Sequence, residues 1–147
     1  MKRTAAVFIS LVTAIALCMM PASATTFPLR KAPPIIGYWK LKVPSLQCSE
    51  IYLFKADGTS EVSSGEERSE SRYEIASVPS AKGFYTFTDT IVKNNGKPDC
   101  SGANTPIGDT AVNYLRFSPA GDQMIMCRNE SLDACIGPFK RIEGPEL

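Results

Sequence analysis

The chain has 147 residues, with 16 Lys and Arg against 15 Asp and Glu, five cysteines and no histidine. The absence of imidazole excludes Ser-His-Asp and Cys-His catalytic pairs as well as histidine metal ligands. The small net charge of +1 argues against nucleic acid as a partner. A chain of this length predicts one domain.

Residues 1–24 are predicted to be a signal peptide rather than part of the fold. Lys2 and Arg3 form a short basic region of the kind typical of bacterial export signals, and the apolar run 5–20 follows. Ala22-Ser23-Ala24 supplies the small residues of a cleavage site. The apolar run is shorter than the roughly 20 residues that a membrane-spanning helix needs, so we expect no membrane span after cleavage. These features predict a periplasmic or secreted protein.

Cleavage changes the cysteine count from odd to even. Removal of residues 1–24 from the 147-residue chain leaves 123 residues, with 14 positive and 15 negative side chains, and it removes Cys18. The cysteines that remain are Cys48, Cys100, Cys127 and Cys135. An even number in an exported chain predicts two disulfides. Their sequence gaps of 52, 27 and 8 do not match the spacing of zinc ligands, so we expect no metal and no cofactor.

The mature sequence predicts an all-β fold of about eight short strands. Residues 25–34 are expected to form an extended N-terminal segment, because their prolines exclude a helix. In the first strand, Trp39, Leu41 and Val43 alternate with basic residues, which is typical of a half-buried strand. The other strands are expected over residues 51–55, 59–64, 72–78, 84–92, 112–117, 123–128 and 135–142.

Three segments carry special expectations. The strand 59–64 is polar and rich in serine, which predicts an edge position or weak burial. The charged stretch 66–70 predicts a solvated loop, in which Glu66 and Glu67 are not expected to act as a catalytic carboxylate pair. Pro138 lies inside the last strand and has no N–H to donate, so that strand is expected to be an edge or to contain a bulge.

Consecutive hairpins favour an antiparallel up-and-down meander that forms a small barrel or half-open barrel over residues 35–142, followed by a tail at 143–147. In this arrangement all four mature cysteines lie at one end. Cys127 then pairs with Cys135 and Cys48 with Cys100, or Cys48 pairs with Cys135 and Cys100 with Cys127. We favour the first pairing.

Gly37-Tyr38-Trp39 at the start of the first strand, followed by a meander, resembles the lipocalin and lipocalin-like β-barrel families. In those families, the first strand opens with G-x-W at the closed end of the barrel. Thr88-Asp89 is similar to their second motif. The resemblance implies that Arg141 packs over Trp39 at the closed end. It also implies that the cysteine end is open, with the loop 95–109 over its mouth.

The expected function is binding without chemistry. Five large residues are candidate core residues and candidate ligand contacts: Trp39, Tyr73, Phe87, Leu115 and Phe117. The first hypothesis is an exported non-enzymatic binding protein for a small apolar ligand or lipid. The alternative is an inhibitor or immunity-type module that binds a protein partner through its loops. A hydrolase is a third hypothesis, although no spacing of Asp and Glu residues points to one. The mature chain is short for a full lipocalin, which argues against a deep cavity.

Overall fold

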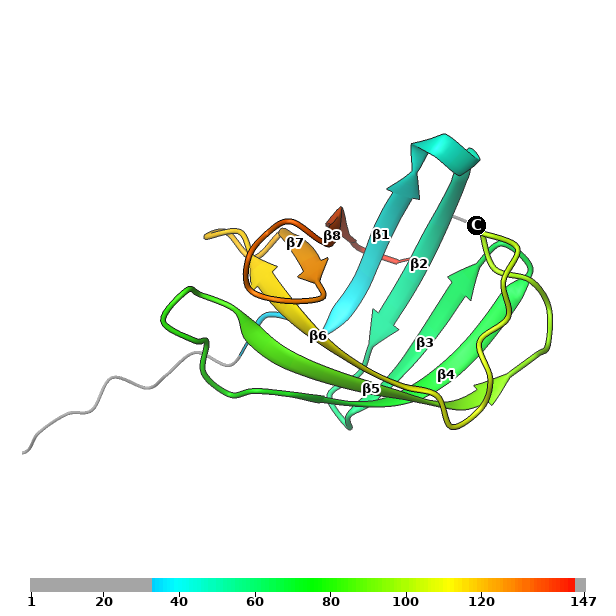
Figure 1. Cartoon of the computed structure of the whole chain (residues 1–147), viewed down its shortest axis with the longest axis horizontal. Helices are drawn as coiled ribbons and strands as arrows, with labels where there is room; N and C mark the ends of the chain where they lie inside the picture. Colours follow the sequence, from blue (N-terminus) through cyan, green and yellow to red (C-terminus); the bar gives the residue numbers. More distant parts are fainter. Residues whose placement is uncertain (1–32, 145–147) are drawn as a thin grey trace, which may run out of the picture.

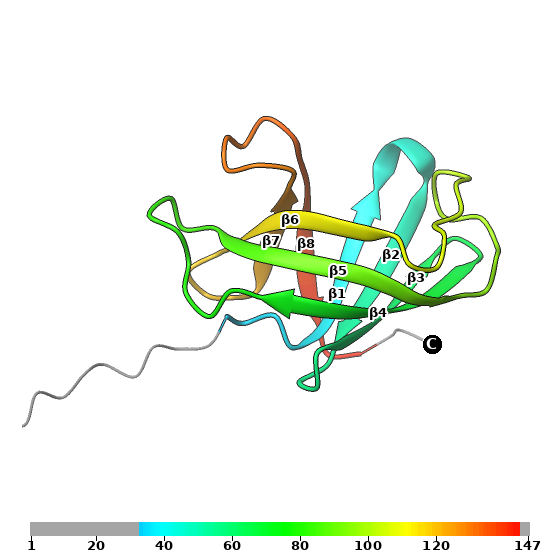
Figure 2. The same cartoon turned by 60° about the horizontal axis from the view of Figure 1, so that its bottom comes forward.

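A computed structural model of the protein describes residues 33–144. Eight antiparallel strands follow one another round a closed barrel, and the last strand pairs with the first (Figures 1 and 2). The strands are β1 (Gly37–Val43), β2 (Cys48–Phe54), β3 (Thr59–Ser64), β4 (Glu67–Ile75), β5 (Tyr85–Asn94), β6 (Thr110–Phe117), β7 (Gln123–Cys127) and β8 (Cys135–Ile142). This confirms the predicted all-β up-and-down meander, in its closed form.

The predicted signal peptide at 1–24, most of the extended segment 25–34 and residues 145–147 of the tail lie outside the described residues. One 3₁₀ turn, η1 (Pro44–Leu46), connects β1 to β2. Within residues 33–144, no helix is long and apolar enough to cross a membrane.

The alternation predicted for the first strand is present in β1. Trp39 and Leu41 are buried in the barrel, whereas Lys42 between Leu41 and Val43 is exposed. The strand pairs with β2 on one side and with β8 on the other, so its inward residues are covered from both directions. The hydrophobic period of two therefore indicates correctly which face of this strand is inside.

The prediction of an edge or weakly buried strand over residues 59–64 is wrong. β3 pairs with β2 and with β4, and a closed barrel leaves no edge strand. Ser60 and Ser64 are buried inside it. Their small side chains occupy inward positions that a search for large apolar residues does not recognise.

The prediction of a solvated loop over residues 66–70 is also wrong. β4 begins at Glu67, and its inward side chains include Glu67, Ser69 and Ser71, all of them buried. Arg68 and Arg72, at alternate positions, are exposed. The strand therefore has a period of two in which charged residues alternate with buried residues that are mainly small and polar.

Pro138 lies in a bulge, as one of the two alternatives predicted. Met124 pairs with Phe139 and Met126 pairs with Ile136, so that Gly137 and Pro138 both oppose the single residue Ile125. Because β8 pairs with β1 as well as β7, it is not an edge strand. The bulge accommodates a residue that cannot donate to the ladder.

The barrel has two different ends. At the closed end, β1 begins, β8 ends, and the connections β2–β3, β4–β5 and β6–β7 turn the chain. At the disulfide end lie the connections β1–β2, β3–β4, β5–β6 and β7–β8, together with all four cysteines of residues 33–144. The loop from β5 to β6 lies beside the β3–β4 turn in both views (Figures 1 and 2).

Candidate functional site

Aromatic side chains fill the closed-end half of the barrel. The Phe54 ring packs edge-on against Tyr73 and Phe87, with ring centroids 5.4 and 5.8 Å apart. Trp39 packs against Phe117 at 6.0 Å. Such ring contacts add to the burial of apolar area, so this half of the barrel is a packed core.

Arg141 packs against this core at the closed end of the barrel. Its guanidinium carbon lies 4.3 Å from the centre of the Trp39 ring. The same group donates hydrogen bonds to the backbone carbonyls of Pro34, Ile36 and Gly121. Gly37 has φ +117°, and a Cβ atom there would lie 2.8 Å from Arg141 Nη1, so this position requires glycine. The packing of Arg141 over Trp39 that the resemblance implies is therefore present.

The two disulfides join Cys48 to Cys100 and Cys127 to Cys135. This is the first of the two pairings considered from the sequence. The Cys48–Cys100 bond ties the long β5–β6 loop to the start of β2, on the far side of β3 and β4. The Cys127–Cys135 bond joins the end of β7 to the start of β8. Both bonds restrain the connections at the disulfide end.

Polar groups also hold the β5–β6 loop against the barrel. The buried Glu67 carboxylate accepts hydrogen bonds from Asn94 Nδ2 at 2.6 Å and from the Thr105 amide at 3.3 Å. The carbonyl of Pro98 accepts the amide of Glu67 at 3.0 Å. A Cβ atom on Gly65 would lie 2.9 Å from the Asp99 carbonyl carbon, so glycine permits this close approach. The loop predicted to cover the mouth is thus braced along the rim of the barrel.

A second polar group lies on β2. Tyr52 donates a hydrogen bond of 2.5 Å to Glu50 Oε2, and Ser64 donates one of 2.7 Å to Glu50 Oε1. Ser64 Oγ in turn accepts the Cys100 amide at 3.0 Å. Burial first, and then the Glu50 carboxylate, raise the pKa of Tyr52 well above its usual value, so Tyr52 remains a donor.

Between the aromatic core and these polar groups lies a cavity of about 90 Å³. Residues of five strands line it: Tyr52, Phe54, Ser60, Val62, Phe87, Asp89, Ala111, Asn113 and Met126. Asp89 Oδ1 and Ser71 Oγ are buried and form no hydrogen bond of good geometry with residues 33–144, although the Ser71 and Ser60 hydroxyls lie close to the Asp89 carboxyl. The cavity therefore contains an acceptor that the described chain leaves unpaired.

Burial raises the pKa of the Asp89 carboxyl, and the nearby hydroxyl groups of Ser71 and Ser60 offset this only in part. Since the folded pKa lies above the unfolded one, this group stabilises the fold most at a pH below its unfolded pKa. That contribution is lost as the pH rises through the folded pKa. We expect Asp89→Asn to remove this pH-dependent loss of stability and so to raise the free energy of unfolding at neutral pH. Urea denaturation between pH 4 and pH 8 measures the effect.

Asp109→Asn is the matched control for this prediction, because Asp109 is exposed in the β5–β6 loop. It should leave the pH dependence of stability as it is in the unchanged protein. If Asp89→Asn lowered stability at neutral pH, the Asp89 carboxylate would be a stabilising charge, and the burial argument would be wrong.

A groove at the disulfide end adjoins the cavity. This mouth groove, of about 390 Å³, is lined by Asn113, Met126, Arg128, Asp133, Ala134, Cys135 and Ile136. Asn113 and Met126 line both hollows. β6 pairs with β7 only from Tyr114 onward, because β7 ends at Cys127 and the first residues of β6 extend beyond it. The mouth groove and the inner cavity together form the candidate site.

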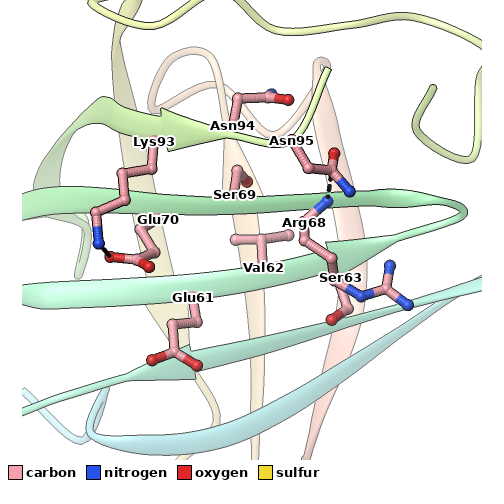
Figure 3. Close-up of a pocket in the computed structure, with 9 residues that line it drawn as sticks. All are labelled: Glu61, Val62, Ser63, Arg68, Ser69, Glu70, Lys93, Asn94 and Asn95. Carbon is pink, nitrogen blue, oxygen red and sulfur yellow. Dashed lines mark hydrogen bonds and ion pairs between the residues drawn. The ribbon is translucent and has the colours of Figure 1, made fainter. Parts of the chain in front are cut away.

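A separate groove of about 360 Å³ lies over β3, β4 and β5 (Figure 3). Its charged groups already have partners within the chain. Lys93 Nζ lies 2.8 Å from Glu70 Oε2, and Glu61 pairs with Lys55. Arg68 donates from its guanidinium to the carbonyls of Gly65 and Glu67. The charged side chains of this groove therefore have partners within the chain, whereas the inner cavity contains the unpaired Asp89 Oδ1.

The five candidate residues from the sequence are distributed unevenly. Phe87 lines the inner cavity, whereas Trp39, Tyr73, Leu115 and Phe117 pack in or against the core. Sequence analysis identified Asp89 only through a motif likeness and did not identify Glu67, Ser71 or Asn113. The alternation of Ser69 and Ser71 with Arg68, Glu70 and Arg72 was the available signal for the polar interior.

Among residues 33–144, no three Asp, Glu or Cys side chains gather as metal ligands. The architecture, an eight-stranded antiparallel up-and-down closed barrel, is consistent with the lipocalin-like fold. No protein-family model matches the chain, and the searches found no curated protein or solved structure with significant similarity.

Proposed function

We propose that this is an exported, non-enzymatic binding protein that recognises a protein partner through its disulfide end. The observation that carries the proposal is the filled interior. The inner cavity measures about 90 Å³, whereas pockets for small organic ligands measure about 300–1,000 Å³. A lipid chain does not fit inside the barrel, and the mouth groove of about 390 Å³ lies at its disulfide end, where side chains of a protein partner reach it. Both features favour the protein-binding alternative over a carrier that encloses an apolar ligand.

The bracing of the disulfide end supports this proposal. Two disulfides are typical of proteins in oxidising compartments, in keeping with export. The Cys48–Cys100 bond and the Glu67 hydrogen bonds hold the β5–β6 loop in one conformation. A surface that is ordered before binding loses less conformational entropy when it meets its partner.

The contact surface we assign to the partner lies where the β5–β6 loop enters the sheet. Val92, Ile107 and Val112 are 37%, 64% and 52% exposed. The Gly108 amide donates to the Ile91 carbonyl at 2.8 Å, and Val112 pairs with Thr88, so the three residues lie along the same β5–β6 hairpin. We call these three residues the β5–β6 patch. Exposed apolar groups in such a setting are typical of protein contacts.

Site-specific cross-linking in the cells that make the protein tests this proposal. A photoreactive amino acid in place of Ile107 or Val112 should give a discrete cross-linked protein band. The same group in place of Val78 is the control, because Val78 is a similarly exposed apolar residue in the β4–β5 connection at the closed end. Equal cross-linking from Val78 and Ile107, or none from either patch position, would contradict recognition through the disulfide end.

A further inference from the structure

The disulfide half of the barrel has an acidic interior. Glu50 and Glu67 point inward, and both carboxylates are occupied by donors of the chain: Tyr52 and Ser64 for Glu50, and Asn94 and the Thr105 amide for Glu67. Asp89 differs, because its buried Oδ1 has no partner among residues 33–144. Arg128, in the mouth groove, is the one cationic residue that lines either hollow.

The walls around Asp89 suit a cation. Tyr52, Phe54 and Phe87 line the cavity, and the faces of aromatic rings attract positive charge. A buried carboxylate oxygen such as Asp89 Oδ1 forms its strongest hydrogen bonds with charged donors. The Asp89 carboxylate would repel an anion, and a long apolar chain would leave Asp89 Oδ1 without a hydrogen-bond donor.

The size and the access route restrict the shape of the ligand. A volume of about 90 Å³ corresponds to about three water molecules, at about 30 Å³ each. The cavity adjoins the mouth groove at Asn113 and Met126, which line both hollows. A compact charged head on a thin flexible alkyl stem matches this arrangement, and the flexible Met126 side chain adapts to such a stem.

We infer that the mouth of the barrel binds a primary ammonium group on an alkyl stem, with Asp89 as its counter-ion. The ammonium head occupies the inner cavity and donates to Asp89 Oδ1, while the stem passes Asn113 and Met126 into the mouth groove. Two sources have this chemistry: a free alkylamine, and a lysine side chain of a protein. The lysine source rests on the proposed function, because the mouth groove lies at the disulfide end.

Titration with n-butylammonium chloride, followed by NMR of backbone amides, tests the site. We expect saturable shifts at Asp89, Asn113 and Met126, and no such saturation with n-butanol, which has a similar shape without the charge. Asp89→Asn should weaken binding about tenfold or more, because a charge-assisted hydrogen bond is lost. Asp109→Asn should leave binding unchanged. Equal affinity of the unchanged protein and Asp89→Asn, or equal binding of n-butanol, would overturn the inference.

A second titration, with Nα-acetyl-lysine amide, distinguishes the sources. Tighter binding than n-butylammonium, together with competition against the cross-link from Ile107, supports a partner lysine. Equal or weaker binding, without competition, supports a free alkylamine. Failure of both titrations while the Ile107 cross-link persists would overturn this inference and leave the proposed function standing. Saturable titrations without any cross-link would reject the proposed function and leave the ammonium site.

Discussion

Replacing Trp39 with alanine is expected to lower the free energy of unfolding by about 3–5 kcal/mol, the range for loss of a large buried aromatic side chain. Trp39 is fully buried, packs against Phe117, and lies beneath the Arg141 guanidinium. Its Nε1–H donates to the Ile35 carbonyl at 2.7 Å. Truncation would therefore open a cavity, leave a carbonyl unpaired and remove the surface on which Arg141 rests.

Urea denaturation followed by far-ultraviolet circular dichroism measures this loss, since the chain has one tryptophan and the variant has no tryptophan fluorescence. Trp39→Phe separates two contributions: it retains most of the ring packing but leaves the Ile35 carbonyl unpaired, at a cost of about 1–3 kcal/mol. Val112→Ala, at an exposed position, should change stability by no more than about 0.5 kcal/mol. A loss below about 1 kcal/mol for Trp39→Ala would contradict the description of the closed end as a packed core.

Removing the Cys48–Cys100 disulfide is expected to have the second large effect. The bond spans 52 residues of sequence, and the chain-entropy relation for a loop of this length gives a loss of about 4 kcal/mol. The Cys127–Cys135 bond spans 8 residues, and the same relation gives about 2.5 kcal/mol. A typical domain is stable by about 5–15 kcal/mol, so either loss is substantial.

The double variants Cys48→Ala/Cys100→Ala and Cys127→Ala/Cys135→Ala provide the comparison, each measured by urea denaturation. Hydrogen exchange adds a local test. Loss of the first bond should speed exchange of the Cys100 amide, which donates to Ser64 Oγ. The Thr105 amide should be affected less, because Glu67 still accepts it. A larger loss of stability from the second double variant would contradict the loop-length argument.

Much of the barrel follows from simple sequence patterns. In β1, apolar and basic residues alternate, so the inward face is identified from the period of two. Asp57-Gly58 turns the chain between β2 and β3, where Gly58 has φ +80°. Once the strands alternate in direction, the cysteines necessarily lie at one end. These features are local, which is why the fold class and the strand order could be predicted.

The same patterns fail in β3 and β4, because the inward residues of these two strands are mostly not hydrophobic. Ser60, Ser64 and Ser71 are buried, and Glu67 is buried with its own hydrogen-bond donors. In β4, charged residues at every second position indicate a strand. Its inward residues are mainly small and polar, so they give no hydrophobic signal. A pattern of charges at every second position is thus as informative as a pattern of apolar residues.

The candidate site is less accessible to sequence analysis. The inner cavity depends on side chains from five strands, and its volume is what remains after all of them pack. Asp89 is a single carboxylate in a threonine-rich strand, and nothing in its neighbours along the chain shows that Oδ1 has no partner. Distant side chains determine both facts, so neither can be inferred from residue spacing.

We propose that recognition takes place at the disulfide end because the barrel interior is filled. Native mass spectrometry of the protein purified from the cells that make it tests whether the interior holds a ligand. We expect the mass of the polypeptide with two disulfides and no lipid in stoichiometric amount. One lipid molecule per chain, released by organic solvent, would show a larger interior than the cavity of about 90 Å³ and would contradict the claim.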